Sequence, residues 1–485
     1  MSAQRVPAQP LLVVLGSTGT GKSDLAVELA TRFRGEIINS DAMQLYNGLP
    51  IITNKITTAE KKGITHHLLG HIPLQDPPWD VEDYKREATK VIAEIRARGN
   101  LPILVGGTQY YVDPLLFPDV ILDEVQQKTD PPKTSFPILE QPTEVLLEEL
   151  RKCDPIMAER WHPNDRRKIS RSLEIYLHTG KPASQFYAEQ EARKAAAAAA
   201  AAKGDVDTRP PWEKLLFWVY SEKEVLRERL DKRVDKMRKA GLLDEVRELY
   251  SFKRDMMSKQ GIALDTSKGI FQSIGYKQFE PYLEAMDAGT DAQQLDKMNL
   301  SALEDMKAAT RRYANYQTKW IRLKQMRRLQ AEGADAVQSL YLLDSTDVSR
   351  FQDHVVEPAA RLTAQFLSGE SRPAAMDMSD LARQVLASAL EPPPRETLVK
   401  RTCELCQTVL VTEQAWQRHL KSTGHRRVMR KKQKLALVAV EQDERPATTG
   451  TLAKEDGHVG DDDGSATSGG TSRTSTPDLG SIFSS

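Results

Sequence analysis

The feature that most constrains this chain is a glycine-rich segment near its start, GSTGTGKS at residues 16–23. It fits the pattern G-x-x-x-x-G-K-[S/T] and follows an apolar run at residues 11–15. In the segment after it, residues 23–34, Leu25, Leu29 and Phe33 recur every four positions, which predicts a helix. A strand, such a loop and a helix form a phosphate-binding loop, whose backbone amides and helix N-terminus bind a diphosphate. Lys22 adds a positive charge, and the Ser23 hydroxyl can bind magnesium. The expected diphosphate-binding residues are Gly16, Ser17, Thr18, Gly19, Thr20, Gly21, Lys22 and Ser23.

Two further strands are predicted to end in small or polar residues. Residues 36–39 are followed by Ser40 and Asp41, and residues 102–105 are followed by Gly106, Gly107 and Thr108. Alternating strands and helices predict a parallel sheet, and the carboxyl ends of its strands meet at one edge, beside the phosphate loop. Asp41 is a candidate general base there, with a turn or helix-cap role as the alternative. Thr108 is either a cap or part of the cleft.

Residues 403–425 have the ligand spacing of a two-cysteine, two-histidine zinc finger, C-x2-C-x12-H-x5-H. The predicted ligands are Cys403, Cys406, His419 and His425. Leu410 and Trp416 are spaced to form the small core of such a finger. Because Cys153 is the only other cysteine, no disulfide framework is possible, and a reducing compartment is expected. A single finger covers only about 3 bp of duplex, which suits an accessory role.

Two segments are wholly basic in a chain whose formal net charge is +0. Residues 307–328 hold eight basic residues and no acidic one, with Tyr313, Tyr316 and Trp320 at helical spacing. Residues 418–434 hold eight more. The basic side chains suit contact with RNA or diphosphate, or else they form a solvated helix face; the aromatic side chains either stack on bases or, more simply, pack in the core. A third basic cluster, residues 162–171, is open to the same alternatives of phosphate contact or a solvated surface.

The predicted fold class is α/β: a P-loop parallel sheet with helices on both faces, an inserted helical subdomain and a small C-terminal zinc finger. Composition divides the 485 residues into six parts. These are the first part of the P-loop core at 10–114, the inserted helical subdomain with an alanine-rich insert at 115–212, the second part of the core at 213–369, a linker at 370–397, the zinc finger and basic helix at 398–436, and a disordered tail at 437–485.

These motifs together resemble the tRNA dimethylallyltransferase (tRNA isopentenyltransferase) family, in its eukaryotic form with a C-terminal zinc finger. The resemblance covers residues 10–367. Besides the phosphate loop, the segments that carry it are EIINSDAMQLYNGLPIITNK, HHLLGHI, PILVGGTQYY, HPNDRRKISRSLEIYLHTGKPAS, ERLDKRVDKMRKAGLLDEV, GIFQSIGYKQF and ATRRYANYQTKW. The chain departs from the family at Ala42, where many members have Ser, and in its alanine run at 195–202.

The resemblance implies transfer of the dimethylallyl group from dimethylallyl diphosphate to N6 of the adenosine 3′ of the anticodon in tRNA, giving N6-dimethylallyladenosine. It implies that Asp41 acts as general base. Lys22, magnesium bound at Ser23 and an arginine, Arg233 in preference to Arg229, would stabilise the leaving diphosphate. The expected tRNA-binding positions are Asp41, Ala42, Met43, Gln44, Thr108, Arg167, Lys168 and Arg171, with Arg311 and Arg312 from the basic segment.

The implied partners are dimethylallyl diphosphate and a tRNA anticodon stem-loop, and the implied cofactors are magnesium and structural zinc. The chain is expected to be a cytoplasmic monomer without a membrane partner, with nucleus and mitochondria also open as compartments. Two other functions stay open from the residues alone. A small-molecule P-loop kinase would need ATP and no tRNA. A non-catalytic zinc-finger RNA-binding protein would bind tRNA without turnover, although the intact Gly21-Lys22-Ser23 argues against it.

Overall fold

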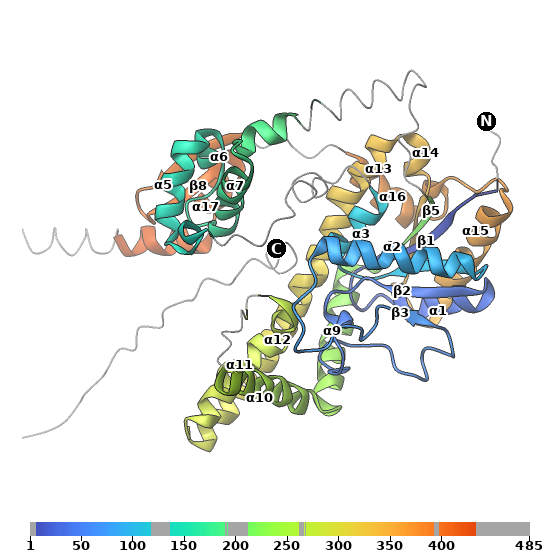
Figure 1. Cartoon of the computed structure of the whole chain (residues 1–485), viewed down its shortest axis with the longest axis horizontal. Helices are drawn as coiled ribbons and strands as arrows, with labels where there is room; N and C mark the ends of the chain where they lie inside the picture. The colour runs from blue at the N-terminus through green and yellow to red at the C-terminus, as the bar shows by residue number, and fades with distance from the viewer. Residues whose placement is uncertain are drawn as a thin grey trace, which may run out of the picture. The chain divides into compact units, whose positions relative to one another are not determined.

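The computed structural model describes residues 6–117, 136–189, 192, 212–260, 266, 268–391 and 397–432. These residues form two compact units (Figure 1). The first contains the described residues up to 117 and from 212 to 391, and the second contains those at 136–192 and 397–432. The alanine run at 195–202 and the expected tail at 437–485 lie outside the described residues. Among the helices described, none is both long enough and apolar enough to cross a membrane.

The first unit is built on a six-stranded sheet with the strand order β3-β2-β4-β1-β5-β6. Its strands are β1 (Pro10–Gly16), β2 (Gly35–Asn39), β3 (His66–His67), β4 (Leu101–Val105), β5 (Glu213–Tyr220) and β6 (Leu340–Asp344). All neighbouring strands pair in parallel, as expected. In the central register, Leu12 of β1 lies between Ile103 of β4 and Leu215 of β5.

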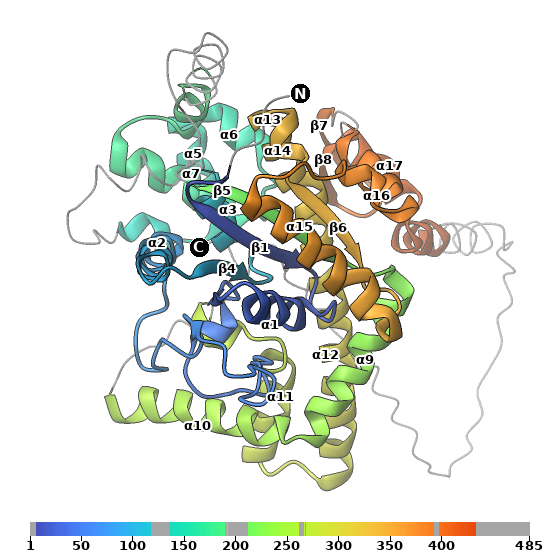
Figure 2. The same cartoon turned by 90° about the vertical axis from the view of Figure 1, so that its right-hand side faces the viewer.

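Helices cover both faces of this sheet. Every residue of β2 and β4 is buried, and successive side chains of a strand point to opposite faces, so both faces must be covered. Helices α1 (Lys22–Arg32) and α15 (Glu357–Ser368) pack against each other (Figure 2), and α2 (Val81–Ala97) packs on β2 and β4. Asp80 caps α2 by accepting from the backbone N–H of Asp83.

The topology places a ligand site at the carboxyl ends of β1 and β5. The chain leaves β1 through α1 toward β2 on one side, and leaves β5 through α9 (Lys223–Lys239) toward β6 on the other. Neighbouring strands whose connections run in opposite directions leave a crevice between them, where ligands of α/β proteins bind. The phosphate loop and α9 therefore border the same crevice.

Further helices of the first unit extend from this edge and pack around it. The long helix α12 (Ala292–Trp320) packs against α9 through Leu226, Leu230 and Ala314. The other elements are η1 (Met43–Leu45), α3 (Gln109–Leu116), α10 (Leu242–Gln260), η3 (Gly269–Gln272), α11 (Tyr276–Asp287), a π-helix at Ile321–Gln325, α13 (Met326–Glu332), α14 (Ala334–Val337), η5 (Val348–Arg350), a second π-helix at Gln352–Val356, η7 (Ala375–Asp377) and α16 (Asp380–Leu390).

Helix α16 departs from the linker expected at residues 370–397. Ala382, Leu386 and Ala389 of this helix are buried in the core of the first unit, and Ser379 caps its N-terminus. Their spacing is that of one helix face, a signal outweighed in the sequence by the three prolines at 392–394. The core of the first unit thus continues beyond residue 369, the end that we predicted from the sequence.

The second unit joins the inserted helices to the C-terminal module. Its elements are η2 (Pro137–Glu140), α5 (Thr143–Cys153), α6 (Pro155–Arg160), α7 (Arg166–Thr179), β7 (Leu398–Cys403), β8 (Thr408–Thr412) and α17 (Glu413–Leu420). Strands β7 and β8 pair antiparallel, and a further helix covers residues 423–432. His162 Nε2 donates to the Val409 carbonyl at 2.9 Å, and Lys400 pairs with Glu159 at 3.3 Å. The sequence did not indicate this contact between segments so far apart in the chain.

Candidate active site

The phosphate loop has the backbone geometry that a diphosphate requires. Gly16 has φ 145°, and a Cβ there would lie 2.3 Å from the Val219 carbonyl oxygen of β5, so only glycine fits. Helix α1 begins at Lys22 without a side-chain cap, which leaves its first amides for a ligand. Lys22 Nζ donates to the Ser17 carbonyl at 2.8 Å, and Thr20 Oγ1 donates to the same oxygen at 2.9 Å. The loop is therefore held open by its own hydrogen bonds.

The three turns predicted to meet at one edge do meet. Thr108 N donates to the Ser40 carbonyl at 3.3 Å, and Ala42 N donates to Thr108 Oγ1 at 3.0 Å. A Cβ at Gly106 would lie 2.1 Å from Ser40 Oγ, so the β4 turn can approach the β2 turn only as glycine. Thr108 is buried, and its hydroxyl holds the turn that carries Asp41.

Asp41, Lys22 and Arg233 line one cavity of about 930 Å³ together with the phosphate loop. Asp41 as a whole residue is half-buried, but its carboxylate is surrounded by protein atoms. This burial raises the pKa of Asp41. The Met43 N–H, which donates to Asp41 Oδ1 at 3.0 Å, and the charge of Lys22 act in the opposite direction. Burial lowers the pKa of Lys22 to about 8 and that of Arg233 to about 10. Two cations and a carboxylate thus share a poorly solvated site.

Of the two arginines considered for the diphosphate, Arg233 is the one at the loop. Its Nη1 donates to Thr18 Oγ1 at 2.9 Å. Arg229 also lines the cavity, but its guanidinium donates to the Thr346 carbonyl. Both come from α9, four residues apart, so they lie on the same face of that helix. This geometry favours Arg233 for a role at the diphosphate.

The structure adds Gln317 of α12, which the sequence reasoning missed. Its Oε1 accepts from Thr18 N at 2.8 Å, and its Nε2 donates to the Gly107 carbonyl at 3.0 Å. Ser17 Oγ donates to the Ala314 carbonyl one turn earlier, at 2.9 Å. Gln317 is 1% exposed. Its position four residues after Tyr313, in a helical face of core residues, was the signal that could have identified it.

The sequence reasoning also missed Glu245 and Lys55, which hold a loop that lines the cavity. Glu245 of α10 accepts from Ile51 N and Ile52 N, at 2.9 and 2.7 Å, and so anchors the loop that follows residue 48. Lys55 of that loop lines the cavity and donates to the Gly48 carbonyl at 2.7 Å. Burial lowers the Lys55 pKa to about 8. Lys55 lies in an irregular loop, which gives no periodic signal, and nothing in the helical pattern around Glu245 marks its partners, which lie 193 and 194 residues away.

A smaller hollow of about 80 Å³ borders the cavity and shares Thr18, Asp41 and Arg233 with it. Met43, Ile52 and Met306 give it apolar walls, and Tyr313 lines it as well. Apolar walls with a few polar groups are typical of a small-molecule site. The hollow can therefore accommodate an apolar group next to the Asp41 carboxylate.

The other positions expected to bind tRNA are distributed over both units. Gln44 Nε2 donates to the Asn54 carbonyl at 3.0 Å in the first unit. In the same unit, Arg311 pairs with Asp231 at 2.5 Å, whereas Arg312 is exposed. Arg167, Lys168 and Arg171 are exposed at the start of α7 in the second unit. Lys168 pairs with Asp165 at 3.0 Å and Arg171 with Glu174 at 2.8 Å.

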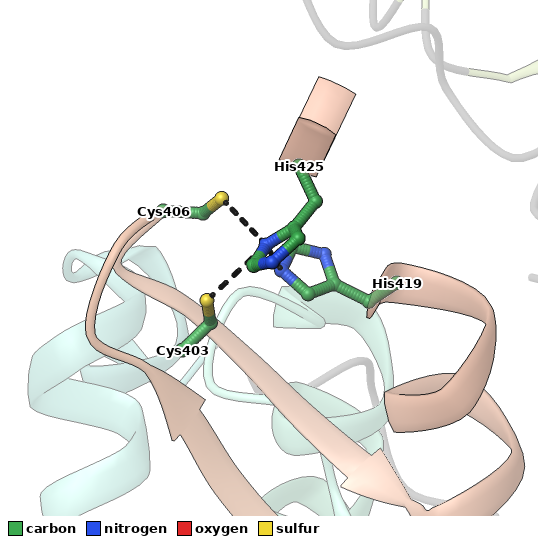
Figure 3. A group of neighbouring side chains, drawn as sticks. All are labelled: Cys403, Cys406, His419 and His425. Carbon is green, nitrogen blue, oxygen red and sulfur yellow. Dashed lines mark hydrogen bonds between the residues drawn. The ribbon is translucent and has the colours of Figure 1, made fainter. Parts of the chain in front are cut away.

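The four predicted metal ligands converge in the second unit (Figure 3). The donor atoms of Cys403, Cys406, His419 and His425 all lie within 4.8 Å of one another. His425 Nδ1 lies 3.4 Å from Cys406 Sγ and 3.2 Å from His419 Nε2. Two thiol sulfurs and two imidazole nitrogens around one point are a donor set that fits a metal ion. The spacing prediction is confirmed at the level of a metal-compatible cluster.

Comparisons with known proteins agree with this geometry. The sequence model described as IPP transferase matches residues 44–324. The chain is 35% identical to the tRNA dimethylallyltransferase of Schizosaccharomyces pombe over 443 residues, which cover 88% of this chain and 96% of the relative. It is 34% identical to the tRNA dimethylallyltransferase of Homo sapiens, over 89% of this chain and 88% of the relative.

A solved structure described as a eukaryotic dimethylallyltransferase acting on tRNA superposes with a TM-score of 0.70 and 30% identity. The match covers 90% of this chain and 100% of the solved chain. Sequence and structure comparisons therefore extend over both units. The chain belongs to the IPP transferase family.

Proposed function

We propose that this chain transfers the dimethylallyl group from dimethylallyl diphosphate to N6 of the adenosine 3′ of the anticodon in tRNA. The observation that carries the proposal is the placement of the Asp41 carboxylate in the same cavity as the phosphate loop. A diphosphate site beside a potential general base suits alkylation of a weak nitrogen nucleophile. The names of the relatives and of the solved structure support the same donor and the same RNA class.

In the proposed reaction, the bond between the dimethylallyl carbon and the diphosphate oxygen breaks, and a bond from that carbon to adenine N6 forms. The exocyclic amine gives up one proton, and Asp41 is the group placed to accept it. Burial raises the Asp41 pKa and so strengthens it as a base, while Lys22 and Arg233 favour its ionised form. No phosphoryl group moves, so the phosphate loop serves to hold the leaving group.

The leaving diphosphate is stabilised by charges and dipoles already in position. Lys22 and Arg233 lie in a poorly solvated site, where each charge interacts more strongly with a developing anion than it would in water. Ser23 lines the cavity at the start of α1, and its hydroxyl suits magnesium coordination. Magnesium bound with the diphosphate would neutralise charge on the leaving oxygens. The apolar walls around Ile52 and Met306 suit the dimethylallyl chain.

The target adenine must leave its stack to reach this cavity. Bases of an anticodon loop are unpaired, and such bases are the RNA features that proteins read most readily. Asp41 and Gln44 line the cavity and Met43 lines the adjoining hollow, which supports their proposed contact with the entering nucleotide. Ala42 and Thr108 are buried behind them, joined by the hydrogen bond from Ala42 N to Thr108 Oγ1, so we propose that they act by holding this turn. Arg167, Lys168 and Arg171 are proposed to bind phosphates of the stem because they are exposed at one helix end.

We propose zinc as the metal at Cys403, Cys406, His419 and His425. Two thiolates and two imidazoles are the ligand set of closed, structural zinc sites. Elemental analysis of the purified chain should find about one zinc per chain. The same analysis of Cys406→Ser should find much less, and equal zinc in both proteins would refute the assignment.

The proposed activity is tested by incubating the protein with tRNA, magnesium and dimethylallyl diphosphate. Digestion of the tRNA followed by mass spectrometry should detect N6-dimethylallyladenosine, and diphosphate should be released in equal amount. A parallel reaction with ATP in place of the donor should transfer no phosphate, which separates this function from a small-molecule kinase. Tight tRNA binding without any product would favour a non-catalytic RNA-binding protein instead.

A further inference from the structure

Helix α9 separates its charges onto two faces. Arg229, Lys232, Arg233 and Lys236 all line the large cavity, and their spacing of three and four residues places them along one face. Asp231 and Asp235 point instead to α12. There Asp231 pairs with Arg311 at 2.5 Å, and Asp235 pairs with Lys307 at 2.8 Å. These four cations of α9 thus face the cavity, while Asp231 and Asp235 neutralise cations of α12.

The four cavity-facing cations differ in depth and in partners. Arg233 donates to the phosphate loop at Thr18, and Arg229 donates to the Thr346 carbonyl. Lys232 and Lys236 are exposed, and within the part of the chain that the structure describes neither forms an ion pair. Both lysines therefore line the cavity with exposed side chains whose ammonium groups are not engaged in an ion pair among the described residues.

The cavity has room for more than the diphosphate donor. Its volume of about 930 Å³ is near the upper end of small-molecule sites. The inner end already supplies the loop amides, Lys22 and Arg233, which satisfy a diphosphate. An acceptor nucleotide that enters the cavity brings its flanking phosphodiesters to the mouth, because the backbone cannot follow the base inside.

We propose that Lys232 and Lys236 form a second anion site, which holds backbone phosphates of the RNA next to the nucleotide that enters the cavity. This inference rests on the proposed function. The sequence predicted RNA contact by the basic segment that includes the end of α12, and we assign part of that contact to α9 instead. The shared chemistry is a phosphate oxygen bound by an ammonium group, and the donor diphosphate is the other possible source of that phosphate. The exposure of both lysines favours the RNA.

The test is the salt dependence of tRNA binding by the full-length protein, measured by fluorescence anisotropy without donor, so that no turnover is involved. Each lysine that neutralises an RNA phosphate contributes about 0.7 to the slope of log K against log salt. The double variant Lys232→Gln/Lys236→Gln should therefore lose about 1.4 of slope and bind on the order of tenfold more weakly at roughly 0.15 M salt. Its KM for dimethylallyl diphosphate at saturating tRNA should equal that of the wild type.

Lys239→Gln is the matched control, because Lys239 is exposed on the same helix but does not line the cavity. Its slope should equal that of the wild type. An unchanged slope in the double variant would overturn the proposal. A raised KM for the donor with an unchanged tRNA slope would assign the two lysines to the donor diphosphate and would also overturn it. A wild type that binds tRNA without making product would instead contradict the proposed function.

Discussion

The side chain of Gln317 and the backbone of Thr18 are joined by a hydrogen bond of 2.8 Å between the Thr18 N–H and Gln317 Oε1. The same side chain donates to Gly107 O, so one buried amide links the phosphate loop, the β4 turn and α12. The loop therefore depends on a helix distant in sequence for its shape. We infer that Gln317 positions the phosphate loop, at which the donor is proposed to bind.

Gln317→Ala should raise the KM for dimethylallyl diphosphate by about tenfold or more, with a smaller change in kcat. The variant removes the acceptor of the partly buried Thr18 N–H, a loss of about 1 kcal/mol, and the loop shifts to find another acceptor. Steady-state kinetics at saturating tRNA measures both constants. Gly107→Ala should give the same defect, because its Cβ would lie 2.1 Å from Gln317 Nε2. A normal donor KM in both variants would contradict the positioning role.

The pH dependence of kcat/KM for the donor should be bell-shaped. The acid limb reports protonation of Asp41, whose pKa burial raises, because a protonated carboxyl cannot accept the proton of the amine. The basic limb should fall near pH 8, since Lys22, with a pKa of about 8, loses its charge as the pH rises through that value. Initial rates at limiting donor across the pH range give both limbs.

Lys22→Arg should move the basic limb to higher pH in whatever activity remains, because a guanidinium stays protonated. Lys55→Arg is the matched control, because Lys55 lines the same cavity and has a similarly lowered pKa of about 8. The limb should stay in place in this variant. Loss of the basic limb in Lys55→Arg alone would assign that limb to Lys55.

Thr108→Val should reduce the free energy of unfolding by about 1–3 kcal/mol, because it removes the buried acceptor of the Ala42 N–H. The turn that carries Asp41 would loosen, and kcat should fall as well. Denaturant unfolding and steady-state kinetics measure the two effects. Thr108→Ser keeps the hydroxyl and should behave like the wild type. Equal stability of the two variants would show that the hydroxyl does not hold the turn.

Removal of a metal bound at the cluster of Cys403 to His425 should destabilise the inserted helices as well as the finger. Structural metal sites contribute directly to folding, and the finger contacts the inserted helices through His162 and Val409. After chelation, amide hydrogen exchange should accelerate in residues 397–432 and also around His162. Cys406→Ser should show the same change, whereas Cys153→Ser, whose thiol lies outside the cluster, should not. Unchanged exchange around His162 would show that the inserted helices do not depend on the finger.

The parts of the fold that rest on local pattern could be predicted from the sequence. The phosphate loop, the apolar strands beside it and the meeting of the turn after β2 with the turn after β4, seen in the bond from Ala42 N to Thr108 Oγ1, follow from motif and strand order, because parallel strands share one edge. The ligand spacing between Cys403 and His425 likewise predicted the cluster that the structure shows. Strand β3 has only two residues, too few for any periodic signal.

The remainder depends on contacts between segments distant in sequence. Gln317 and Glu245 act on backbone groups far along the chain, and nothing local in their sequence marks those partners. The basic segment at 307–328 predicted an RNA surface, yet Arg311 pairs with Asp231 of α9. Charge content alone cannot reveal which cations are already neutralised, because that depends on which helices pack together.

The most direct test of the central claim is a comparison of Asp41→Asn with the wild type in two separate assays. The first measures binding of dimethylallyl diphosphate with magnesium, and the second measures N6-dimethylallyladenosine in tRNA by mass spectrometry. Asp41→Asn keeps the shape of the side chain and lacks the base, so donor binding should stay within a few-fold while product formation falls by about 10²–10⁴-fold. Undiminished product formation by Asp41→Asn would contradict the proposed role of this carboxylate.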